Sequence, residues 1–382
     1  MKIEKLTLPD SAIDFLKSQG YEKLYPPQSD CVKSGLLDGK SILVSAPTAS
    51  GKTLIAMLAM LSYLSKNKGK VIYLSPLRAL AAEKFTEFKK LEKISLGKKI
   101  KTSISTGDFE NIEKNLEKSN ILILTNEKMD SIIRHGAEWI DDIGLVISDE
   151  VHLIGDESRG PTLEMILTHL KLLESKPQII GLSATITNSN EIADWLDCKL
   201  VKNDWRPVPL SEGVCDGGKV TMSDGETFEV KPSLRGIPID LGVQSVQNGG
   251  QSLVFAETRV RSKSLATKAA DVISQLLIKK ELTALEKTSK QILSENEHTE
   301  IVKTLATLVK KGVAFHHAGL NQKCREIVEK EFRKGTIKLL SSTPTLAAGV
   351  NLPARRVVIS NINRYNAKVG ANRPISVLEY KQ

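Results

Sequence analysis

Short apolar runs, each followed by a segment with helical spacing, recur through the first half of the chain. A strand that is buried on both faces of a sheet has a continuous apolar sequence, and parallel strands are joined by helices. The pattern therefore predicts an α/β domain over residues 1–200, with a mostly parallel sheet flanked by helices. The predicted strands span residues 41–46, 71–76, 121–126, 145–150 and 179–185, and a helix that begins with proline is predicted at 161–174.

The pattern changes after residue 200 and then returns. Short strands and turns are predicted first, with the sequence SDGE at 223–226 as a hairpin turn. A second α/β domain is then predicted, so that the whole domain spans residues 201–382. Its strands are predicted at 252–258, 313–319, 337–343 and 356–361, and a long polar helical stretch covers 260–311.

The chain has a net charge of +9, from 54 basic and 45 acidic residues. Such an excess suits a polyanionic partner such as nucleic acid. The four cysteines are scattered and lack a zinc-binding pattern. The longest apolar stretch, residues 54–64, is too short to span a bilayer, and the N-terminus lacks the apolar core of a signal peptide. We expect a cytoplasmic protein with no membrane partner.

Residues 46–53, APTASGKT, match the phosphate-loop pattern G-x-x-x-x-G-K-[ST], except that Ala46 replaces the first glycine. Gly51 lets the backbone pass close to phosphate, Lys52 can reach the β- and γ-phosphates, and the Thr53 hydroxyl can ligate magnesium. ATP and Mg²⁺ are therefore the predicted ligand and cofactor, although a small polar turn would have a similar sequence. The predicted ATP-binding residues of the loop are Thr48, Ser50, Gly51, Lys52 and Thr53.

Two adjacent carboxylates, Asp149 and Glu150, end an apolar run, where ionised groups are costly to bury. Asp149 can hold magnesium, directly or through water, and Glu150 can orient and deprotonate the attacking water. A bound dication and triphosphate would make the local charge tolerable. The pair could instead form a solvated turn, but the lysine loop at another strand end favours hydrolysis of a phosphoryl bond. The predicted catalytic residues are Lys52, Asp149 and Glu150, and the predicted magnesium ligands are Thr53 and Asp149.

Three of these segments resemble, in order, motifs I, II and III of the superfamily 2 helicases: the phosphate loop, DEVH at 149–152 and GLSAT at 181–185. The sequence YPPQ, which ends at Gln28, is similar to the Q motif, in which the glutamine reads the adenine edge. Together with RGPTLE at 159–164, the motifs indicate the DExH branch that contains the archaeal Holliday-junction-migration repair helicases. Other segments resemble further motifs of the family: SPLRALA at 75–81, STGD at 105–108, TNEKMDSIIR at 125–134, SLVFAETR at 252–259, VAFHHAGL at 313–320 and TPTLAAGVNLPARRVVI at 343–359.

The resemblance implies two tandem RecA-like domains that clamp ATP between them. A single DNA strand would run across both domains and be tracked from 3′ to 5′. A hairpin within 361–377 would help to part the duplex, with Tyr365 as a candidate wedge residue. The residues that would link hydrolysis to strand movement are His152, Ser183, Thr185 and Gly349.

The same resemblance implies forked or junction DNA as the substrate, in replication-coupled repair and recombination. The implied protein partners are a junction resolvase, a sliding clamp or a single-strand-binding protein. Contacts to phosphate carry no sequence information and therefore suit a motor that must traverse any sequence. The candidates for such contacts are Arg78, Thr106, Thr125 and Thr343. Arg78 is the strongest, because a guanidinium can donate two hydrogen bonds to phosphate oxygens, whereas each threonine could instead cap a helix.

The chain ends at Gln382, where the resemblance places the start of motif VI. The arginines of that motif would stabilise charge at the γ-phosphate, and loss of such an arginine commonly costs about 10³–10⁵ in rate. We therefore expect a fragment of a longer helicase, which binds ATP and weakly binds DNA but hydrolyses ATP and unwinds DNA poorly.

Two other functions fit the same motifs. An RNA helicase of the same branch would grip phosphate and sugar alike, and a non-catalytic scaffold would bind ATP and DNA in order to recruit partners. A transporter subunit or a small-molecule kinase with a phosphate loop would not be expected to have the sequence TLAAGVNLP in a second domain.

Overall fold

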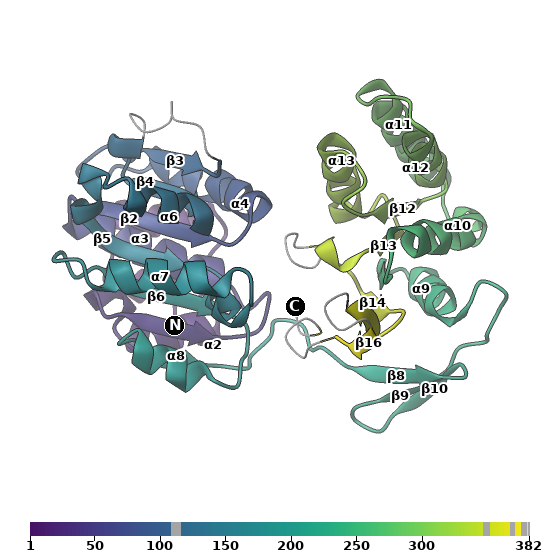
Figure 1. The fold of residues 1–382 in the computed structure, drawn as a ribbon, viewed down its shortest axis with the longest axis horizontal. Helices are drawn as coiled ribbons and strands as arrows, with labels where there is room; N and C mark the ends of the chain where they lie inside the picture. Colours follow the sequence, from purple (N-terminus) through teal and green to yellow (C-terminus); the bar gives the residue numbers. More distant parts are fainter. Residues whose placement is uncertain (108–115, 347–351, 367–370, 376–379, 381–382) are drawn as a thin grey trace. The chain divides into compact units, whose positions relative to one another are not determined.

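The chain divides into two compact units, called unit 1 (residues 1–209) and unit 2 (residues 210–382), shown in Figure 1. The division falls after Pro209, whereas the sequence analysis placed the domain boundary after residue 200. The computed structural model describes residues 1–107, 116–346, 352–366, 371–375 and 380.

A sheet of seven parallel strands forms the centre of unit 1, in the order β3-β4-β2-β5-β6-β1-β7. In that order the strands are Thr102–Ser105, Ile121–Thr125, Lys70–Ser75, Ile143–Ser148, Gln178–Ser183, Ile42–Ser45 and Lys199–Lys202. The predicted strands of this domain are confirmed as β1, β2, β4, β5 and β6. The edge strands β3 and β7 were not predicted, because their sequences TSIS and KLVK are only partly buried and have no continuous apolar run.

Helices cover both faces of this sheet (Figure 1). Successive residues of a strand point to opposite faces, so Ile42 and Val44 of β1 pack with helices α1 to α4, whereas Leu43 packs with α6 to α8. The helix predicted at 161–174 is confirmed as α7. The helices are α1 (Asp10–Ser18), α2 (Pro26–Lys33), α3 (Lys52–Lys66), α4 (Arg78–Phe88), α6 (Asn126–Arg134), α7 (Gly160–Lys171) and α8 (Ser189–Trp195).

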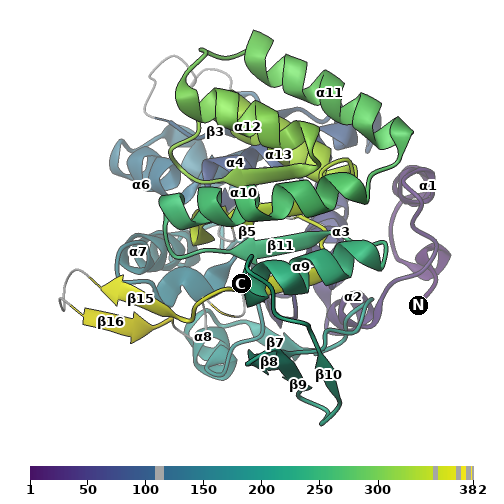
Figure 2. The same cartoon turned by 90° about the vertical axis from the view of Figure 1, so that its right-hand side faces the viewer.

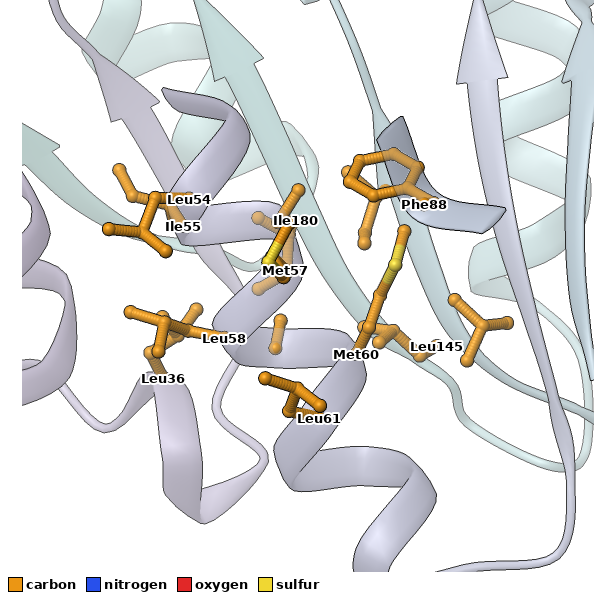
Figure 3. Close-up of a cluster of buried hydrophobic side chains, with 14 of the residues drawn as sticks. Leu36, Leu54, Ile55, Met57, Leu58, Met60, Leu61, Phe88, Leu145 and Ile180 are labelled. Atoms are coloured by element: carbon orange, nitrogen blue, oxygen red, sulfur yellow. The ribbon is translucent and has the colours of Figure 1, made fainter. Parts of the chain in front are cut away.

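Helix α3 accounts for the longest apolar stretch of the sequence. Every residue from Leu54 to Ser62 is buried. Figure 3 shows side chains of this helix in one cluster with Ile180 and Leu145 of the sheet and with Leu36. The stretch is therefore apolar on nearly all sides because the helix is enclosed by the sheet and its neighbours.

Within the part of the chain that the structure describes, no helix combines the length and the apolar character needed to cross a bilayer.

Unit 2 begins with a three-stranded antiparallel sheet, β10-β9-β8. The predicted turn at 223–226 is confirmed, because it joins β9 to β10 and Met222 N donates to Glu226 O over 2.8 Å. Gly225 in this turn has a φ of 89°, which residues with a side chain rarely adopt. The strands are β8 (Gly213–Asp216), β9 (Lys219–Met222) and β10 (Thr227–Glu229).

A four-stranded parallel sheet, in the order β12-β13-β11-β14, forms the centre of unit 2. The four predicted strands are confirmed as β11 (Ser252–Phe255), β12 (Val313–His316), β13 (Leu339–Ser342) and β14 (Arg356–Ile359). Further along, β15 (Asn363–Asn366) and β16 (Ala371–Pro374) pair antiparallel within the segment 361–377, where a hairpin was predicted.

The long helical stretch predicted at 260–311 consists of three helices. No glycine or proline in this stretch marks where one helix ends and the next begins. The start of α11 is capped by Glu281, which accepts a hydrogen bond from Ile278 N over 3.0 Å. Figure 2 shows α11 and α12 side by side, with α10 and α9 lying over the sheet. The helices of unit 2 are α9 (Ile237–Gln247), α10 (Arg259–Gln275), α11 (Lys279–Ser294), α12 (Glu300–Lys310) and α13 (Gln322–Arg333).

We predict that Leu58→Ala lowers the free energy of unfolding of unit 1 by about 2–5 kcal/mol, the usual cost of the cavity that a buried leucine leaves. Leu58 lies in the middle of α3 and is fully buried. Urea unfolding followed by circular dichroism measures the change. The matched control is Leu172→Ala, because Leu172 is 75% exposed and exposed substitutions usually change stability by less than about 0.5 kcal/mol. Equal losses in both variants would contradict the packing of α3.

Candidate nucleotide site and nucleic-acid interface

The predicted functional residues of unit 1 follow the carboxyl ends of parallel strands, and these ends meet at one edge of the sheet. The order of the strands divides this edge into two halves. The phosphate loop, Asp149 and Ser183 belong to one half, which contains β1, β5 and β6. The other half contains β2, β3 and β4, which are followed or ended by Arg78, Thr106 and Thr125. The two halves meet where β2 pairs with β5.

The phosphate loop connects β1 to α3 and has two residues in the left-handed region, Ala49 with a φ of 65° and Gly51 with a φ of 86°. A Cβ at Gly51 would lie 2.0 Å from Nε2 of Gln28, so only glycine fits there. Ala46, in the position of the pattern's first glycine, is buried and has no positive φ. An alanine is therefore compatible with the backbone at that position.

Two side chains at the end of the phosphate loop, Lys52 and Thr53, form hydrogen bonds within unit 1. Lys52 Nζ donates to the loop carbonyls of Ala46, over 2.9 Å, and Pro47, over 3.4 Å. Burial lowers the pKa of Lys52, while the carboxylates of the strand end oppose that shift. Thr53 Oγ1 accepts a hydrogen bond from Lys84 Nζ of α4 over 2.7 Å.

The Ser50 hydroxyl is buried and has no hydrogen-bond partner among the described residues. Such a group is costly unless it is satisfied, and a phosphate oxygen would accept its hydrogen bond. Thr53 and Asp149 offer a hydroxyl and a carboxylate oxygen, the type of ligand that Mg²⁺ prefers. These residues therefore fit a nucleotide with magnesium.

Gln28 ties helix α2 to the phosphate loop. Its Oε1 accepts from Tyr25 N over 2.7 Å, and its Nε2 donates to Gly51 O over 3.2 Å. The side chain is buried, and its role in reading adenine stays a prediction. The Tyr25 ring lies 4.5 Å from that of Trp205, measured between centroids. Arg206, the next residue, is close enough to Lys52 to lower the pKa of that lysine.

Asp149 directly follows β5 and is buried. Its Oδ2 accepts from the Tyr73 hydroxyl over 2.6 Å, and its Oδ1 accepts from Glu150 N over 3.1 Å. Sequence analysis missed Tyr73 and Lys84, which hold the two predicted magnesium ligands. A tyrosine within a buried strand signals that its hydroxyl needs a partner, but it does not say which one.

Glu150 has a φ of 51°, which turns the chain sharply after the strand. Burial and, secondly, the neighbouring Asp149 raise the pKa of Glu150 to about 7. His152 Nδ1 lies 3.3 Å from Glu150 Oε2 and 3.4 Å from Ser183 Oγ. Burial lowers the pKa of His152 to about 4, so the imidazole is neutral near pH 7. The structure thus brings together Glu150, His152 and Ser183, while Thr185 lies half-buried in the bend after β6.

The predicted phosphate contacts differ in exposure. Arg78 is exposed at the first position of α4, and Thr106 is half-buried just after β3. Thr125 is buried and caps α6, since its hydroxyl accepts from Lys128 N over 3.3 Å. In unit 2, Thr343 follows β13 and is buried. Tyr365 belongs to β15, but its side chain lies outside the described part of the structure, as does the whole of Gly349.

Comparison with protein families gives two matches along the chain. Residues 25–192 match the model of the DEAD/DEAH box helicases, and residues 237–369 match the helicase conserved C-terminal domain. The first range contains the phosphate loop and Asp149, and the second contains the parallel sheet of unit 2.

Curated proteins named ATP-dependent DNA helicase Hel308 are similar to the chain over its whole length. The identity is 44% to the protein of Methanocella arvoryzae, 43% to that of Pyrococcus horikoshii and 42% to that of Caldivirga maquilingensis. The chain spans about half the length of these relatives, namely 51%, 51% and 50%. Two helicase domain models in this order, with such identity along the entire chain, show that it belongs to the superfamily 2 helicases and is of the Hel308 type.

Proposed function

We propose that the chain supplies the ATP-driven motor of a DNA helicase, which moves 3′ to 5′ along one strand of forked or junction DNA. The role would lie in replication-coupled repair and recombination in the cytoplasm. A junction resolvase, a sliding clamp or a single-strand-binding protein would be its partner. The proposal is supported by relatives that are named ATP-dependent DNA helicases.

One observation carries the proposal. Lys52 of the phosphate loop lies close enough to Asp149 and Glu150 that both carboxylates act on its pKa. A lysine for phosphates, a carboxylate for metal and a second carboxylate for water are thus gathered at one sheet edge. This is the set of groups that hydrolysis of a nucleoside triphosphate needs.

Each group has a separate task in ATP hydrolysis. Lys52 and the N-terminal amides of α3 bind the phosphate oxygens. Thr53 and Asp149 would hold Mg²⁺, which neutralises phosphate charge when it is bound. Glu150 orients a water molecule and accepts its proton, and a pKa of about 7 suits a base that works near neutral pH.

The two neighbouring halves of the sheet edge support the proposal that ATP hydrolysis is coupled to movement along a DNA strand. Arg78 follows β2, which pairs directly with β5, the strand that Asp149 follows. His152 joins Glu150 to the end of β6 through Ser183. A movement of the groups around the scissile phosphate would therefore be transmitted to the neighbouring strand ends through these contacts.

We predict that Glu150→Gln retains ATP binding but lowers the rate of hydrolysis by about 10²–10⁴, the usual contribution of a general base. Glutamine keeps the shape of the side chain and cannot accept the proton. Binding of a fluorescent ATP analogue and phosphate release measure the two effects. The matched control is Glu164→Gln on α7, where the carboxylate is exposed. A scaffold without catalysis would show no difference between the two variants.

We predict that Arg78→Ala weakens binding of single-stranded DNA about tenfold, since a charge-assisted hydrogen bond is lost. The loss should be the same for every base sequence, and the slope of log affinity against log salt should fall by about 0.7. Fluorescence anisotropy over a salt series measures both quantities. Arg134→Ala is the control, because this exposed arginine ends α6, away from the edge where the helix begins. An unchanged salt slope in Arg78→Ala would contradict the assigned phosphate contact.

However slowly the chain hydrolyses ATP, we predict that it unwinds a DNA duplex with a 3′ tail faster than the same duplex with a 5′ tail. Contacts at phosphates impose a direction because the strand backbone is itself directional. A matched RNA duplex with a 3′ tail should also be unwound more slowly. Gel assays of strand displacement compare the three substrates. Equal rates on the RNA would favour an RNA helicase, and faster unwinding from a 5′ tail would overturn the proposed polarity.

A further inference from the structure

Strand β2 places a tyrosine against the acidic end of its neighbour. Tyr73 is fully buried, in the same core cluster as Val71 of this strand and Phe88 of α4. Its hydroxyl donates to Asp149 Oδ2 over 2.6 Å. The phenol is therefore the donor of this bond, and the carboxylate is the acceptor.

The consequence is that both oxygens of the Asp149 carboxylate are held. Tyr73 donates to Oδ2, and the backbone N–H of Glu150 donates to Oδ1 over 3.1 Å. A carboxylate has about four lone-pair positions, so these two donors leave others for a metal ion. Two donors on different oxygens also resist rotation of the carboxylate. Its orientation is thus set by the protein itself.

The Tyr73 side chain, which supplies the first of these donors, is held in place by its neighbours. The Tyr73 ring packs on Phe88 of α4, with 5.1 Å between centroids and 59° between planes. The backbone of the same strand also contacts Asp149, since Asp149 N donates to Leu74 O over 2.9 Å. Lys84 of α4 donates to Thr53 Oγ1 over 2.7 Å. The segment formed by β2 and α4 therefore touches both proposed magnesium ligands.

We propose that Tyr73 is a positioning residue of the magnesium site, which holds the Asp149 carboxylate in the orientation that binds the metal. The inference rests on the proposed function, because it requires ATP and Mg²⁺ at the phosphate loop. Tyr73 does not touch the reacting atoms and acts only through Asp149. Loss of such a partner behind a metal ligand commonly costs about 10–100-fold in metal affinity.

The test is Tyr73→Phe, which removes the hydroxyl and keeps the ring on Phe88. Binding of a fluorescent ATP analogue is titrated with Mg²⁺, and it is measured separately in EDTA. We expect the Mg²⁺ midpoint to rise about 10–100-fold, while binding in EDTA stays unchanged. The matched control is Tyr63→Phe on α3, where the hydroxyl lies beside Gly144 at the start of β5. This control should keep the midpoint of the parent chain.

A double-mutant cycle with Asp149→Asn separates positioning from general loss of stability. If Tyr73 acts through Asp149, Tyr73→Phe should add no further shift in midpoint once the carboxylate is gone. Thermal unfolding of each variant shows whether the fold is retained. A parent-like midpoint in Tyr73→Phe, or full additivity with Asp149→Asn, would overturn the inference alone. Absence of Mg²⁺-dependent ATP binding in the parent chain would overturn the proposed function as well.

Discussion

Two carboxylates at the end of a buried strand set the main electrostatic constraint on unit 1. Ionised groups in such a place are unfavourable unless charges or hydrogen-bond donors surround them. Asp149 obtains these donors from Tyr73 and from the backbone of Glu150. Glu150 has less support, and its pKa rises to about 7 through burial and through Asp149. The difference suits the two carboxylates to the separate roles proposed for them, because hydrogen bonds hold Asp149 in one orientation while Glu150 can exchange a proton near neutral pH.

The order of the strands places the proposed nucleotide residues beside the candidate DNA contacts, which is an arrangement that suits a motor protein. The proposed nucleotide residues follow β1 and β5, and the proposed coupling residues end or follow β6. The candidate contacts to DNA follow β2 and β3 or end β4. A parallel sheet brings all of these strand ends to one edge, so no long connection is needed between them. Strand β2 stands at the boundary, since it pairs with β4 on one side and with β5 on the other. Arg78 and Tyr73 therefore belong to one continuous segment of strand and helix.

Most of the parallel strands and the phosphate loop could be predicted from the sequence, because a strand buried on both faces has a continuous apolar run. The edge strands β3 and β7 escaped prediction because partial burial leaves no such run. Tyr73 and Asp149 are 76 residues apart in the chain, and only the pairing of β2 with β5 joins them. Gln28 could be proposed as a site residue from its motif, but its bonds to Tyr25 and Gly51 depend on how α2 packs against the loop. Local sequence patterns indicate which residues are candidates for binding or catalysis. The packing of distant segments decides which other residues form hydrogen bonds with those candidates.

The cations around the phosphate loop suggest why a polyphosphate suits this site. Arg206 and Lys84 both lower the pKa of Lys52, so each of them repels the Lys52 cation. Lys52 and Lys84 also act on Glu150, but burial and Asp149 outweigh them. A bound triphosphate would relieve the repulsion among the lysines and satisfy the buried Ser50 hydroxyl at the same time. A ligand with several negative oxygens would therefore gain more from the site than a single carboxylate would.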